Sequence, residues 1–155
     1  MEAQILGMSP EIFGRLGAGL VMGIAALGAA LGMSTAGAAA VGAAKRCYKA
    51  NKPVPMIPMI IFAGFPLTGV FYGFILMGQM LAVSISAANA GLMFGFGVGA
   101  GLAIALAMIA EGKVGAAACD AISDTGKGLV LYMSILGIIE TVALFAMVFT
   151  MINLG

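Results

Sequence analysis

Four long apolar runs, separated by short polar segments, make up most of the chain. They cover approximately residues 12–44, 54–83, 91–118 and 128–153. Each run exceeds the about 20 residues that an α-helix needs to cross a bilayer. Backbone groups inside lipid must be hydrogen-bonded within the chain, and the runs lack the alternating polarity of a membrane β-barrel. The pattern therefore predicts an all-α membrane protein with four transmembrane helices.

The polar segments predict how these helices face the membrane. The segment near 45–52 is basic, the segment near 119–127 carries charges of both signs, and the middle segment at 84–89 has none. Basic loops tend to stay on the cytoplasmic side. We therefore expect the loops near 45–52 and 119–127 to be cytoplasmic, with both termini on the opposite side.

The two halves of the chain resemble each other. Residues 30–33 read Ala-Leu-Gly-Met, and residues 105–108 read Ala-Leu-Ala-Met. A hairpin returns the chain to its starting side of the membrane, so two hairpins in series have the same orientation. We predict two tandem helical hairpins, 1–86 and 87–155.

Composition supports a membrane protein and excludes several functions. The chain is 63% hydrophobic and 8% charged, whereas soluble domains carry about 25% charged residues. A net charge of +1 does not suit a nucleic-acid partner. There is no His, and Cys47 and Cys119 are too isolated for a metal motif. The 24 glycines predict closely packed helices.

The first helix has a recognisable start. Ser9 is a good cap, Pro10 suits the first turn, and Glu11 suits the positive end of a helix. Residues 1–14 show no basic region followed by a cleavage site, so we expect no secretory signal.

Two carboxylates lie inside the apolar runs. Glu140 comes about twelve residues into the last run, near mid-membrane, where a charge costs about 2.5–3.5 kcal/mol. Glu111 precedes a turn expected near Thr125 by about the distance at which Glu140 follows it, so both should lie at similar depth. Alternatively, Glu140 is a neutral acid that bonds a neighbouring helix, and Glu111 pairs with Lys113 near the interface.

The second run supplies a face that could complement these carboxylates. Phe65, Thr68 and Tyr72 are spaced by three and four residues and therefore share a helix stripe. Pro66 removes one backbone hydrogen bond and frees nearby carbonyls for a ligand. The alternatives are that Pro66 only kinks the helix and that Tyr72 only packs.

These residues resemble a known family. The elements that carry the resemblance are Gly95-x-Gly97-x-Gly99-x-Gly101, Ala110-Glu111-Gly112-Lys113-Val114, Phe65-Pro66-Leu67-Thr68 with Tyr72-Gly73-Phe74, and Ile139-Glu140-Thr141. The chain resembles the proteolipid (K or c) subunit of V-type and A-type rotary ATPases, in its duplicated four-helix form. The resemblance implies a non-catalytic subunit that forms a membrane ring of identical copies. It also implies a stator partner with an essential arginine, a central-stalk partner, and ATP hydrolysis on other subunits.

The resemblance also implies roles for single residues. Glu140 would carry the cation, and Tyr72 would hold its carboxylate in the closed state. Glu111, Thr141, Thr68 and the Phe65 carbonyl would supply further oxygens. The first hairpin has Leu67 where the second has Glu140, which implies one carried ion per chain.

Two departures concern the ion. Sodium-type relatives often have Gln where this chain has Gly69, and Gln where it has Glu111. Two carboxylates around one monovalent ion leave a surplus charge, so one should stay protonated, and we take Glu140 as the anion and Glu111 as the proton donor.

Na⁺ is the favoured ion, because it prefers several oxygens. H⁺ remains an alternative. A small multidrug or cation transporter and a purely structural proteolipid or pore former are further alternatives. We expect no cofactor besides the transported ion, membrane lipids as neighbours, and a prokaryotic cell membrane as the location.

Overall fold

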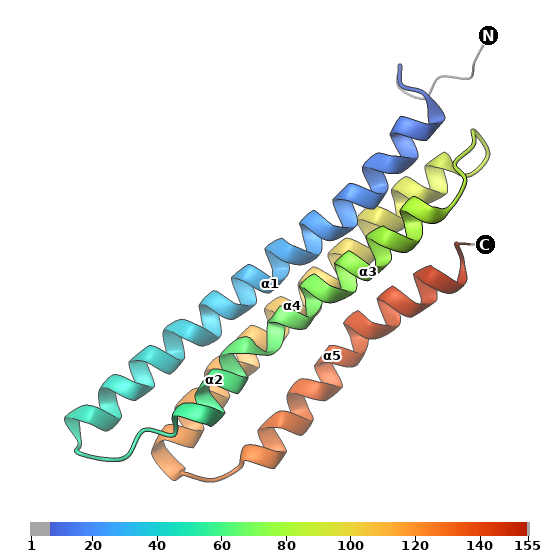
Figure 1. The fold of residues 1–155 in the computed structure, drawn as a ribbon. Helices are drawn as coiled ribbons and strands as arrows, with labels where there is room; N and C mark the ends of the chain where they lie inside the picture. Colours follow the sequence, from blue (N-terminus) through green and yellow to red (C-terminus); the bar gives the residue numbers. More distant parts are fainter. Residues whose placement is uncertain (1–6, 155) are drawn as a thin grey trace.

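The computed structural model describes residues 7–154, and the elements within them are all helices (Figure 1). The elements are α1 (Pro10–Lys49), α2 (Met56–Gly64), the short 3₁₀ helix η1 (Phe65–Leu67), α3 (Thr68–Ala82), α4 (Ala90–Thr125) and α5 (Leu129–Ile152). With α2, η1 and α3 taken as one rod, four helices are long and apolar enough to cross a membrane. The predicted all-α class and its four spans are confirmed.

The helices run alternately up and down. The α1–α2 and α4–α5 connections lie at one end of the bundle, and residues 83–89 lie at the other end, as do the start of α1 and the end of α5 (Figure 1). The predicted division between 86 and 87 falls inside this middle connection. The assignment of each hairpin as a separate unit, and of one end to the cytoplasm, stays a prediction.

The helix ends differ from the ends of the apolar runs. Ser9 caps α1 as expected, since its hydroxyl accepts the Ile12 N–H at 3.4 Å. At the other end α1 continues through the basic residues to Lys49, and α4 continues to Thr125. Much of the two expected charged loops is therefore helix. Polarity marks where a helix leaves the apolar layer and not where the helix ends. In α1 the basic residues of the last turn also favour the helix, because they interact with its negative end.

Glycine sets the closest contact in the fold, which is between α1 and α4. A Cβ added at Gly97 would overlap the backbone of Gly17, and one added at Gly112 would overlap that of Gly32. Gly28 lies equally close to Ala105. In lipid, where water does not drive helices together, such close backbone approach provides much of the packing energy. The pair α1–α4 is thus the most closely packed part of the bundle.

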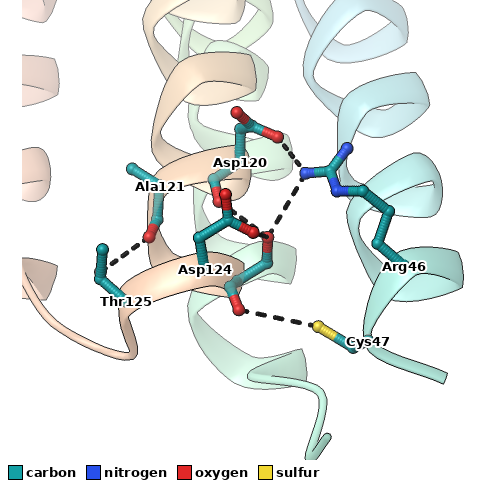
Figure 2. A network of polar contacts seen from close by, with 7 residues as sticks. Arg46, Cys47, Asp120, Ala121, Asp124 and Thr125 are labelled. Atoms are coloured by element: carbon teal, nitrogen blue, oxygen red, sulfur yellow. Dashed lines mark hydrogen bonds and ion pairs between the residues drawn. The ribbon is translucent and has the colours of Figure 1, made fainter. Parts of the chain in front are cut away.

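A polar network joins the same two helices near their C-terminal ends (Figure 2). Arg46 pairs with Asp120 and also donates to the Ser123 hydroxyl at 3.5 Å. The Cys47 thiol contacts the Ser123 carbonyl at 3.8 Å. The Arg46 and Asp120 side chains are more than half exposed, so their pair contributes little in water-like surroundings.

Helix α5 is the least buried of the four spans. Its buried positions form one stripe at helical spacing, consisting of Leu136, Ala143, Met147 and Thr150. Glu140 lies on this same stripe, four residues after Leu136 and three before Ala143. The carboxylate is therefore positioned at the seam between α5 and the rest of the bundle.

Candidate ion-binding site

The site is organised by the break between α2 and α3. Pro66 lacks an N–H, and residues 65–67 tighten into a 3₁₀ turn at this point. The Phe65 carbonyl accepts the Thr68 backbone N–H and also the Thr68 hydroxyl, the latter at 3.1 Å. The predicted break at Pro66 is present, but the Phe65 carbonyl is not left free, because it accepts both Thr68 donors. Its role as an ion ligand stays a prediction.

Glu140 meets this break from α5. Its Oε1 accepts a hydrogen bond from the Tyr72 hydroxyl at 2.8 Å. Phe65, Thr68 and Glu140 line one surface groove of about 350 Å³, together with Leu67 and Phe71. Residues that carry a carboxylate, a hydroxyl and a backbone carbonyl, from α5, α3 and η1, thus line one largely apolar groove. These are the oxygen types that hard cations take.

Glu111 lies in the core of the bundle on α4 and is not among the residues that line this groove. Its side chain is fully buried, and neither carboxyl oxygen has a hydrogen-bond partner among the described residues. Burying a polar group without a hydrogen bond costs free energy. Binding of a ligand or of another chain that hydrogen-bonds the Glu111 carboxyl group would therefore be favourable.

Lys113 does not change this arrangement. Its side chain is exposed, and it makes no ion pair with Glu111 within the described part of the chain. The alternative interface pairing is therefore not formed.

Thr141 behaves differently from the other predicted ligands. Its hydroxyl donates to the Ile138 carbonyl at 2.6 Å, and its side chain is exposed. It does not line the groove that Phe65, Thr68 and Glu140 share. The structure brings those three together with Tyr72 and leaves Thr141 outside.

Met108 is a neighbour of the site that the sequence patterns did not single out. It is fully buried on α4, three residues before Glu111. Its sulfur accepts the Gly69 N–H at 3.1 Å and lies 3.7 Å from the Thr68 hydroxyl. A side chain at Gly69 would overlap Met108, which gives a physical reason for glycine at that position. The helical spacing from Glu111 was the available signal, but methionine usually serves as adaptable filler.

A comparison with protein families adds independent information. Residues 16–80 match the family model of the ATP synthase C subunit. The match covers just over two-fifths of the chain, from α1 through most of α3. The matched region thus includes Phe65, Thr68 and Tyr72, whereas Glu111 and Glu140 lie outside it. No curated protein matches the chain.

Proposed function

We propose that this chain is the rotor-ring subunit of a V/A-type rotary ATPase and that it carries Na⁺ across the membrane on Glu140. The observation that carries the proposal is the meeting of Glu140 with Tyr72 and with the groove formed by Phe65 and Thr68. The match of residues 16–80 to the ATP synthase C subunit supports a ring of identical copies that has no catalytic site of its own. In this proposal ATP is hydrolysed on other subunits, a stator arginine releases the ion, and a central stalk turns with the ring.

The choice of Na⁺ follows from the number of oxygens. Glu140, Thr68 and Phe65 line one groove, and Glu111, buried on α4, has no hydrogen-bond partner among the described residues. A hard monovalent cation is selected by several such oxygens. A proton would need only Glu140. With Na⁺ bound, one of the two carboxyl groups stays protonated, and the buried Glu111 is the better candidate because the charged form is the costlier one to bury.

The number of ions per chain follows from Leu67. It takes the place in the first hairpin that Glu140 takes in the second, and it opens onto the same groove without adding a charge. One carrier per four helices means fewer ions moved per turn of the ring. An ATP-driven pump then builds a steeper gradient for each ATP.

Carbodiimide labelling of Glu140 tests the ion. The protein in detergent is labelled at fixed pH with rising NaCl, and KCl at matched ionic strength serves as the control. We expect protection by millimolar Na⁺ and none by K⁺, and Glu140→Gln should abolish the labelling. Labelling that responds to pH alone would identify H⁺ as the ion.

The assembly is tested separately. We expect an SDS-resistant ring of identical copies with a lipid-filled centre, visible by electron microscopy. A monomer or dimer with a central aromatic cavity would instead indicate a small transporter and contradict the proposal.

A further inference from the structure

The Thr68 hydroxyl has two possible acceptors, and they lie on different elements. The first is the Phe65 carbonyl at 3.1 Å, one turn earlier on the same rod. The second is the Met108 sulfur at 3.7 Å, on α4. A hydroxyl has one proton and two lone pairs, so at any moment it donates fully to only one of them.

Cation binding would force a choice between these acceptors. In the proposed site, both the Phe65 carbonyl and the Thr68 oxygen turn lone pairs toward the ion. A hydroxyl proton that points at the Phe65 carbonyl occupies one of those lone pairs and sets positive charge beside the cation. Rotation of the hydroxyl toward Met108 removes both conflicts and keeps the proton hydrogen-bonded.

The Met108 sulfur is held in a position to accept the rotated Thr68 hydroxyl. Its side chain is fully buried, and its sulfur already accepts the Gly69 N–H at 3.1 Å. No Cβ at Gly69 pushes it away, and any larger residue there would overlap it. Because a thioether is a weak acceptor, the hydroxyl can return to the carbonyl when the ion leaves.

We infer that Met108 is a positioning residue for ion binding, which accepts the Thr68 hydroxyl proton in the ion-bound form and so frees Thr68 and the Phe65 carbonyl to ligate Na⁺. This inference rests on the proposed function. It predicts that Met108 contributes to Na⁺ affinity only when the Thr68 hydroxyl is present. A packing role would not depend on that atom.

A double-mutant cycle tests the inference on the assembled protein. The Na⁺ concentration that half-protects Glu140 from carbodiimide is measured for wild type, Met108→Leu, Thr68→Val and the double variant. We expect Met108→Leu to weaken Na⁺ binding about two- to tenfold when Thr68 is present, the range of one modest hydrogen bond. In the Thr68→Val background the same substitution should have no effect. An equal loss in both backgrounds, or no loss in either, would overturn the inference.

Two further variants keep the test decisive. Met93→Leu is the matched control, since Met93 lies on the same helix and is 2% exposed, with no hydrogen bond to its sulfur among the described residues. It should leave Na⁺ affinity unchanged. Met108→Gln keeps an acceptor of similar reach and should bind Na⁺ at least as well as wild type. Binding as weak as that of Met108→Leu would count against the inference.

The failure of the proposed function would look different from the failure of this inference. A wild-type protein that responds only to pH overturns the sodium function. A wild-type protein that is protected by Na⁺, with no coupling between Met108 and Thr68, overturns only the role of Met108.

Discussion

The hydrogen bond from Tyr72 to Glu140 allows a quantitative prediction about ion affinity. Tyr72→Phe removes the donor at 2.8 Å and leaves the ring in place. Hydrogen bonds to charged groups contribute about 1.5–3 kcal/mol, and they are roughly twice as strong as those between neutral groups. Na⁺ binds the carboxylate form, whereas its competitor is a proton on the same group. The change in Na⁺ affinity depends only on how much more strongly Tyr72 hydrogen-bonds the Na⁺-bound carboxylate than the protonated carboxyl group. We therefore expect Na⁺ affinity to fall about three- to tenfold.

The assay is again the Na⁺ concentration that half-protects Glu140 from carbodiimide at fixed pH. Tyr132→Phe is the matched control, because Tyr132 is also partly buried and its hydroxyl donates no hydrogen bond to any described residue. That variant should bind Na⁺ like wild type. A Tyr72→Phe affinity within twofold of wild type would show that this hydrogen bond is not kept in the ion-bound form, and the reasoning would be wrong.

Three more predictions concern the packing and the second carboxylate. Gly97→Ala should lower the free energy of unfolding in SDS by about 1–3 kcal/mol, as followed by circular dichroism. At Gly99 no atom of the chain lies near an added Cβ, so Gly99→Ala should leave this free energy unchanged or raise it by up to about 1 kcal/mol. Equal effects would contradict the packing argument. Glu111→Gln should keep Na⁺ binding but flatten its pH dependence in the labelling assay, and complete loss of binding would refute a protonated donor. A double-mutant cycle on Arg46 and Asp120 should give a coupling below about 1 kcal/mol, since both side chains are more than half exposed. A coupling of several kcal/mol would mean that the pair is sequestered from solvent in the assembled protein.

The helices were predictable because lipid leaves the backbone few alternatives. Runs longer than a bilayer must be helical, and the start at Ser9 follows from a local cap. The contact between Tyr72 and Glu140 was predicted only through the family resemblance. The residue pattern placed both at similar depth but left open whether their helices touch. The exact helix ends were harder to predict from the sequence, since polarity marks the edge of the apolar layer rather than the last helical residue.

Other parts of the site depend on how two helices fit together, which no local pattern records. Met108 touches Thr68 and Gly69 only because α4 approaches the broken rod closely at that level. Thr141 directly follows Glu140, but neighbours on a helix point about 100° apart. Its hydroxyl donates to the Ile138 carbonyl of its own helix, and its role as an ion ligand stays a prediction.

Glu111 and Glu140 carry the same chemical group but differ in how far each side chain is exposed at the surface of the chain. Glu111 lies on the helix that glycine contacts fix against α1, and its side chain is fully buried. Glu140 lies on the least buried span, is partly exposed, and opens onto a surface groove. A carrier must meet its ion, hold it, and present it to another subunit, and each step requires a group that can reach the surface. Glu140 meets this requirement and Glu111 does not. In the proposed function Glu111 therefore acts on the site through its charge state and not as the carrier.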